Sequence, residues 1–223
     1  MTIHHHVSDD LLLAYAAGSL AEGWSLAVAT HLALCPHCRN RVRAAERIGG
    51  EMLEALAPDA PVDTSWALVR ARLEAARPAE TSERVQPAVG ATGRDAAVLP
   101  EPLRRYAGGD ADSLRWQPLG RGAYQILLPI GDGETRARLL RIPAGKPVPE
   151  HGHGGRELTL VLRGSFRDGN QLFARGDLQD ADASLTHQPI ATPLEDCICL
   201  AVTDAPLRFR KWIVRLIQPV LGI

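Results

Sequence analysis

The spacing of apolar residues changes along this 223-residue chain, and it predicts helices in the first third and strands in the remainder. Between about residues 8 and 77, apolar positions recur every three or four residues, as on the buried face of a helix. Four helices are expected there. Gly18 ends the first, and Pro36 suits the first turn of the third because its missing N–H would have no helical partner. The inward face of the fourth, capped by Thr64 or Ser65, is predicted to carry Trp66, Val69, Leu73 and Ala76.

From about residue 95 onward, short apolar runs alternate with turn residues, which indicates an antiparallel β-sandwich or barrel. The runs 124–130 and 137–142 flank a Gly-Asp-Gly turn, and the Asp-Gly-Asn at 168–170 marks a hairpin. Further strands are expected at 158–162, 185–191 and 197–203. The closing stretch 211–216 is compatible with helix or strand.

Residues 78–94 separate the two halves. Prolines, glycines and polar residues follow one another there with neither period, which is typical of a linker. The sequence therefore predicts a multidomain α + β protein, with a four-helix domain at residues 1–77, a linker at 78–94 and a β domain at 95–223.

The composition disfavours several classes of function. The apolar content of 45% is ordinary for a globular protein, and a net charge of −1 gives no overall attraction to nucleic acid or acidic membranes. We find no run of about 18 apolar residues that would span a membrane. The polar, histidine-rich start does not resemble a signal peptide, and four cysteines are few for a disulfide scaffold. A cytoplasmic protein is expected.

A first set of metal-type ligands lies between the second and third predicted helices. His31 and Cys35 are one helical turn apart on the same face, and Cys38 follows where the chain turns back. A structural zinc site needs four ligands. The fourth would come from one of the three leading histidines, His4, His5 and His6. We predict His6, because it has the shortest tether to the first helix.

Other interpretations of this set stay open. A Cys-x-x-Cys pair can be redox-active, although such pairs usually follow a strand, and the cysteines could also be unliganded core residues. His37, inside the same turn, competes as a ligand. A DNA-reading zinc finger is disfavoured, because residues 1–77 hold seven arginines and no lysine against nine acidic residues. We therefore expect a protein partner and no direct nucleic-acid binding.

A second set has the spacing Gly145-x5-His151-x-His153-x3-Glu157-x6-Gly164. Its three ligand-type residues occupy odd-numbered positions, which share one side of a β-strand. Imidazoles and a carboxylate on one wall suit Zn²⁺, Mn²⁺ or Fe²⁺. The pattern resembles the first signature of the cupin superfamily at every defined position.

The second cupin signature is only partly present. Gly176 and His187 keep its spacing, but its proline, second glycine and asparagine are replaced by Asp182, Ser184 and Ala191. We predict a second divalent metal, with zinc expected first and Mn²⁺ or Fe²⁺ as alternatives, held by His151, His153, Glu157 and His187. A vestigial, empty site is the opposing interpretation. No extra acid/base group accompanies the motif, so no catalytic residue is predicted, and binding or sensing is favoured over catalysis.

Cys197 and Cys199 lie on one face of a predicted strand. Two small hydrophobic wall residues are the simpler interpretation. The alternative is a pair of thiols near the metal that is oxidised during signalling.

The combination of His-x3-Cys-x2-Cys between helices, an upstream histidine, a linker and a cupin resembles the ChrR type of zinc-binding anti-sigma factor. The opening HHVSDDLLLAYAAGSL and the closing LIQPVLGI add to the resemblance, which covers nearly the whole chain. It implies a heterodimer with an extracytoplasmic-function (group IV) sigma factor, whose binding to RNA polymerase the helical domain blocks. It also implies a cupin that takes part in release under oxidative stress, singlet oxygen being the associated signal. The rival functions are a dioxygenase-like cupin enzyme with a helical interaction domain and a zinc-dependent DNA-binding repressor.

Overall fold

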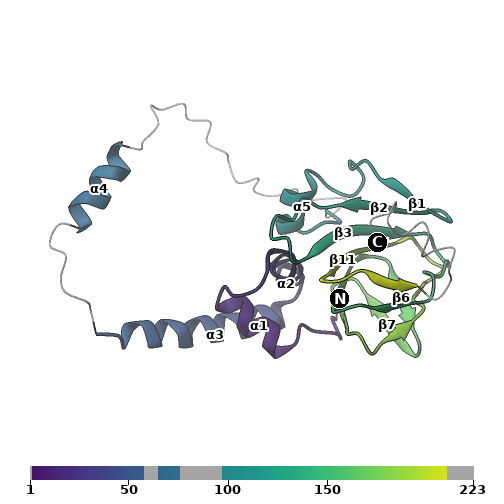
Figure 1. The fold of residues 1–223 in the computed structure, drawn as a ribbon, viewed down its shortest axis with the longest axis horizontal. Helices are drawn as coiled ribbons and strands as arrows, with labels where there is room; N and C mark the ends of the chain where they lie inside the picture. The colour runs from purple at the N-terminus through teal and green to yellow at the C-terminus, as the bar shows by residue number, and fades with distance from the viewer. Residues whose placement is uncertain (1, 58–64, 76–96, 210–223) are drawn as a thin grey trace. The chain divides into compact units, whose positions relative to one another are not determined.

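The computed structural model describes residues 2–57, 65–75 and 97–209 (Figure 1). The chain forms two compact units. The larger combines residues up to Arg47 with those from Ala97 onward, and the smaller comprises Ile48–Ala96. The predicted linker at 78–94 and the closing stretch 211–216 lie outside the described residues, so the division at residues 77 and 95 stays a prediction.

The four expected helices are present at the expected places. They are α1 (Asp9–Ala16), α2 (Glu22–Leu34), α3 (Pro36–Glu54) and α4 (Ser65–Ala75). Gly18 follows α1 with φ of 68°, a conformation that glycine adopts without steric cost. A fifth helix, α5 (Glu101–Ala107), was not predicted. It has only seven residues, too few for a clear period, although Gly108 ends it in the left-handed conformation.

The predicted inward face of α4 is wrong in the described residues. Trp66 is 69% exposed, and Val69 and Leu73 are exposed as well. Helical spacing shows that apolar residues share a face, but it does not show what covers that face. Ala76 lies outside the described residues.

Within the described residues, the β part consists of one six-stranded and two three-stranded sheets. The six-stranded sheet has the order β1-β2-β3-β11-β5-β8, and the smaller sheets have the orders β10-β6-β7 and β12-β4-β9. All registered pairs are antiparallel, as predicted, and β6 and β7 form the expected hairpin around Gly169. The strands are β1 (Gln117–Gly120), β2 (Ala123–Leu127), β3 (Arg136–Ile142), β4 (His151–His153), β5 (Glu157–Arg163), β6 (Ser165–Asp168), β7 (Gln171–Ala174), β8 (Leu178–Ala181), β9 (Thr186–His187), β10 (Ile190–Ala191), β11 (Cys197–Thr203) and β12 (Leu207–Phe209).

The side chains of strand β11 show what each face of the large sheet packs against. Its even-numbered apolar side chains join a core that also contains residues of α1, α2 and α5. Its odd-numbered side chains face the interior of the sandwich, where a cavity lies. The first set is Ile198, Leu200 and Val202, and the second is Cys197, Cys199, Ala201 and Thr203. Strand β11 is therefore buried on both sides.

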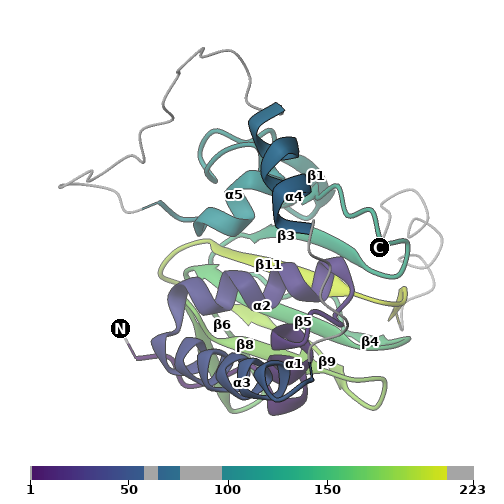
Figure 2. The same ribbon diagram turned by 90° about the vertical axis from the view of Figure 1, so that its left-hand side faces the viewer.

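Helix α2 packs closely on the outer face of this sheet (Figure 2). The N–H of Gly23 donates to Oγ1 of Thr135 at 3.1 Å and to Oδ2 of Asp132 at 3.3 Å. A Cβ at Gly23 would lie 2.3 Å from that Oγ1, so only glycine permits this approach. Next to it, Tyr106 of α5 donates to Oε1 of Glu22 at 2.9 Å. The first helices and the sandwich thus form one packed body.

Two candidate metal centres

The first centre brings together His6, His31, Cys35 and Cys38, whose ligand atoms all lie within 4.8 Å of one another. Nδ1 of His6 lies 3.4 Å from Sγ of Cys35 and 3.5 Å from Sγ of Cys38. His31 comes from the last turn of α2, Cys35 caps that helix, and Cys38 lies in the first turn of α3. Of the three leading histidines, His6 is the one that reaches the group. The ring of the competing His37 lies beside that of His6, tilted by 41° with ring centroids 4.7 Å apart, and His37 is not part of the group.

These residues fit a zinc ion. Zinc bonds of about 2.3 Å to sulfur and about 2.05 Å to nitrogen place tetrahedral S and N ligands about 3.6 Å apart. The two S···N distances above agree with that spacing. Both ring nitrogens of His31 are buried without a hydrogen-bond partner, although buried polar atoms are normally paired. A bound cation would satisfy one of them.

The protonation states in this centre also suit a metal. Burial lowers the pKa of His31 to about 4. The pKa of His6 is also lowered, mainly by burial and to a smaller extent by the charge of His37. Both imidazoles are therefore neutral near pH 7, so each has a nitrogen lone pair available to a metal. Burial raises the pKa of Cys38 to about 11. A metal must therefore displace the proton of this thiol on binding, which couples metal affinity to pH.

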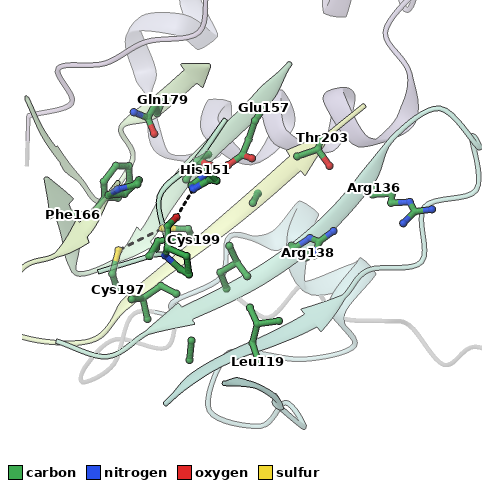
Figure 3. Close-up of a pocket in the computed structure, with 18 of the residues that line it drawn as sticks. Leu119, Arg136, Arg138, His151, Glu157, Phe166, Gln179, Cys197, Cys199 and Thr203 are labelled. Atoms are coloured by element: carbon green, nitrogen blue, oxygen red, sulfur yellow. Dashed lines mark hydrogen bonds between the residues drawn. The ribbon is translucent and has the colours of Figure 1, made fainter. Parts of the chain in front are cut away.

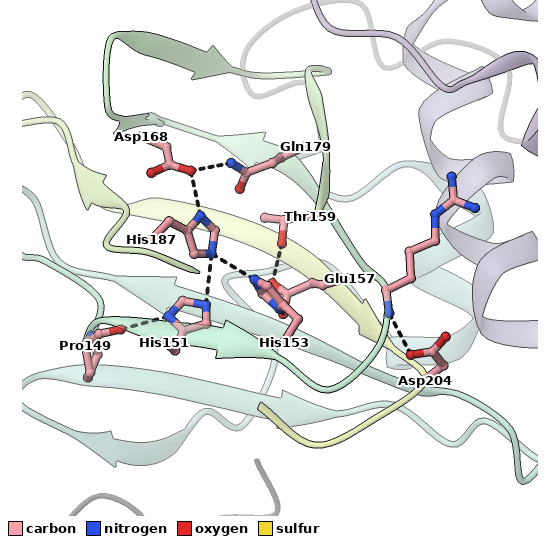
Figure 4. A network of polar contacts seen from close by, with 10 residues as sticks. Pro149, His151, His153, Glu157, Thr159, Asp168, Gln179, His187 and Asp204 are labelled. Atoms are coloured by element: carbon pink, nitrogen blue, oxygen red, sulfur yellow. Dashed lines mark hydrogen bonds and ion pairs between the residues drawn. The ribbon is translucent and has the colours of Figure 1, made fainter. Parts of the chain in front are cut away.

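The second centre joins three buried imidazoles from two strands (Figure 4). His151 of β4 is the register partner of His187 of β9. Nε2 of His187 lies 3.1 Å from Nε2 of His151 and 3.1 Å from Nε2 of His153. Ligand nitrogens about 2.1 Å from a metal are separated by about 3.0–3.4 Å. The three nitrogens are therefore spaced as donors to one ion.

The outer nitrogens of two of these rings have partners that hold them in place. Nδ1 of His187 lies 2.6 Å from Oδ2 of Asp168, which also accepts a 2.6 Å bond from the side chain of Gln179. Nδ1 of His151 lies 2.8 Å from the carbonyl oxygen of Pro149. Such outer contacts orient metal-binding histidines. Sequence reasoning missed Asp168 as a partner, because it marked only a hairpin turn there.

Glu157 lies beside the imidazoles. Its Oε2 is 3.4 Å from Nδ1 of His153, and its Oε1 accepts a 2.8 Å bond from the hydroxyl of Thr159. Burial alone would raise its pKa, but contact with His153, the charges of His151 and His153, and the Thr159 bond hold the pKa below its ordinary value. The group is therefore a carboxylate near pH 7. Its role as a fourth ligand stays a prediction.

A cavity of about 1010 Å³ opens beside this centre (Figure 3). His151 and Glu157 line it, together with Phe166 and apolar side chains of β3 and β11. Cys197 and Cys199 are buried in its wall with their Sγ atoms 3.5 Å apart. The hydrogen bond between the Cys199 and Cys197 thiols, together with burial, raises the pKa of Cys199. This thiol is therefore protonated near pH 7, which suits the role of a wall residue.

Among residues 2–57, 65–75 and 97–209, no helix combines the length and apolar character that crossing a bilayer requires.

Comparison with known proteins agrees with this architecture. Residues 105–206 match the family model described as the ChrR Cupin-like domain. The Anti-sigma-E factor ChrR of Cereibacter sphaeroides is 50% identical over 223 residues, covering 100% of both chains. The crystal structure of Rhodobacter sphaeroides SigE in complex with the anti-sigma ChrR contains a chain 48% identical, with a TM-score of 0.77, over 91% of this chain and 100% of that one. The chain therefore belongs to the family of ChrR anti-sigma factors.

Proposed function

We propose that this protein is an anti-sigma factor that forms a heterodimer with an extracytoplasmic-function (group IV) sigma factor and keeps it from RNA polymerase. The observation that carries the proposal is the 50% identity to the Anti-sigma-E factor ChrR over the full length of both chains. Because its partner would act with RNA polymerase, we place the protein in the cytoplasm. Its predicted anti-sigma domain is residues 1–77.

An exposed apolar surface supports a protein partner. Within the described part of Ile48–Ala96, large apolar side chains of α3 and α4 are more than 45% exposed. Large apolar side chains that are exposed in such number often mark an interaction site. The side chains are Ile48, Met52, Leu53, Leu56, Trp66, Leu68, Val69 and Leu73.

The first metal centre would hold zinc through His6, His31, Cys35 and Cys38. Four protein ligands close the site, so zinc there would be structural. It would join the segment before α1, the end of α2 and the start of α3. Binding energy at such a site is also folding energy, so loss of zinc is expected to loosen these helices.

The cupin domain, residues 95–223, would hold a second divalent metal at His151, His153 and His187, with Glu157 as the predicted fourth ligand. Zinc is expected first, with Mn²⁺ or Fe²⁺ as alternatives, because the ligand set accepts all three. We propose a sensing role without catalysis, in which this domain takes part in release of the sigma factor under oxidative stress such as singlet oxygen. No catalytic residue is assigned.

Co-expression with an extracytoplasmic-function sigma factor from the same genome, followed by pull-down, tests the anti-sigma function. Trp66→Asp places a charge in the exposed apolar surface and should weaken the complex at least tenfold, since buried aromatic contacts dominate interfaces. The control is Leu194→Asp, on the sandwich, where the native side chain is 93% exposed. The wild-type protein should also inhibit transcription that depends on the sigma factor. Failure to bind any such sigma factor contradicts the proposal.

The cavity favours one alternative, a dioxygenase-like cupin enzyme. It reaches His151, so a small molecule could approach a metal there. Oxygen consumption by Fe²⁺-loaded protein with a panel of small organic substrates tests this function. Turnover abolished by His151→Ala would favour it over sensing.

A further inference from the structure

The turn between β7 and β8 contacts the segment that carries His6. Asp177 in this turn is 1% exposed, and its carboxylate has three backbone donors. Oδ1 accepts the N–H of His4 at 2.7 Å and that of His5 at 2.9 Å. Oδ2 accepts the N–H of Ala174 at 2.9 Å, within the turn itself. A side chain of the β-sandwich therefore holds the two residues that precede a proposed zinc ligand.

Backbone contacts strengthen this connection. The N–H of Leu178, the first residue of β8, donates to the carbonyl oxygen of His5 at 3.1 Å. The segment before α1 is therefore bonded to the sandwich on both sides of the His5 peptide unit. His6 follows directly, so its backbone position depends on these bonds.

The preceding residue of the turn, Gly176, lies close to chain neighbours of the first centre. Gly176 has φ of +89°, and a Cβ there would lie 2.6 Å from the side chain of Ile3 and 3.7 Å from Cβ of Leu34. The turn thus lies against the residues around both proposed imidazole ligands.

Asp177 is charged in this setting. Burial alone would raise its pKa, but the N–H groups of Ala174, His5 and His4 hold the pKa below its ordinary value. A fixed negative charge at this place favours a bound cation.

We propose that Asp177 and Gly176 are positioning residues for the first metal centre, so that the cupin domain raises the zinc affinity of the anti-sigma domain. The inference rests on the proposed zinc site. Ordering a residue costs backbone conformational entropy. Because the sandwich turn already holds His4 and His5 in place, part of this entropy is lost on folding and is not lost again when zinc binds.

The test is a cobalt titration of the full chain followed by displacement with zinc. Only thiolate ligands give the intense thiolate-to-cobalt absorption band, so the signal reports the centre with Cys35 and Cys38 and not the imidazole centre. Asp177→Asn and Gly176→Ala should each weaken zinc binding about tenfold, at the lower end of the usual effect of outer contacts.

Asp110→Asn is the matched control. Asp110 also accepts two consecutive backbone N–H groups, of Val98 at 3.0 Å and Leu99 at 2.8 Å, but it does not contact the first metal centre. This variant should melt at a lower temperature and keep wild-type zinc affinity. Equal zinc affinity in wild type, Asp177→Asn and Gly176→Ala overturns the inference.

The zinc proposal and this inference fail in different ways. A wild-type chain without the thiolate–cobalt band contradicts the zinc site itself. Hydrogen exchange on metal-free wild type gives a readout that needs no variant. The amides of His4 and His5 should stay protected, and free exchange at both would overturn the inference even if the variants did not fold.

Discussion

Replacing Gly23 by alanine tests the packing of α2 on the six-stranded sheet. The new Cβ would lie 2.3 Å from Oγ1 of Thr135 and 3.1 Å from Cγ1 of Val202, so the threonine must move by at least about 0.7 Å to reach 3.0 Å. Thr135 has little room, because it is 6% exposed and its hydroxyl donates to Asp132 at 2.7 Å. Overpacking of this kind costs about 1–3 kcal/mol, and the lost Gly23 hydrogen bond about 1 kcal/mol. The higher helix propensity of alanine offsets at most about 1 kcal/mol of this destabilisation. The free energy of unfolding should fall by about 1–3 kcal/mol.

Equilibrium denaturation of the zinc-loaded full chain, followed by near-UV circular dichroism and fluorescence, measures this change. Gly50→Ala is the control, because a Cβ there meets nothing within 4 Å and α3 continues through that position. The control should be neutral or stabilising by up to about 1 kcal/mol. If Gly23→Ala matched Gly50→Ala in sign and size, the close approach of α2 to the sheet would be refuted.

Three further outcomes are expected. Cys35→Ser should remove one equivalent of zinc by elemental analysis and lower the melting temperature, whereas His37→Ala should change neither; full zinc retention in Cys35→Ser would contradict the first centre. Burial alone would raise the pKa of Asp132, but hydrogen bonds from Thr135, Glu134 and Gly23 lower this pKa to about 2. The carboxylate therefore contributes to stability above pH 4, and that contribution is lost as the pH falls toward 2. Denaturation at several pH values should therefore show the difference between wild type and Asp132→Asn shrinking over that range, and a constant difference would refute the assignment. Leu200→Ala, at a side chain 0% exposed, should cost about 2–5 kcal/mol in denaturant titrations, whereas Leu194→Ala should cost less than about 0.5 kcal/mol; equal costs would contradict the described core.

Local spacing was enough to predict much of this protein. His31 and Cys35 are one turn apart in any helix, and Pro36 begins α3 for a reason that is local to its own peptide bond. His151 and His153 share a side because strand geometry alternates side chains. The hairpin around Gly169 and the strand at 197–203 follow from the same short-range rules. In each case neighbouring residues determine the geometry.

Tertiary structure decided what spacing leaves open. The sequence offered three leading histidines, and His6 reaches the first centre because Asp177 and Leu178, more than 170 residues away, hold the chain before it. The partner of His187 is Asp168, which only the folded β6–β7 hairpin brings to that ring. Helical period grouped the apolar residues of α4 on one face but wrongly predicted that this face is buried. A period records which residues lie together, whereas burial and metal ligation depend on surfaces that meet only when distant segments pack.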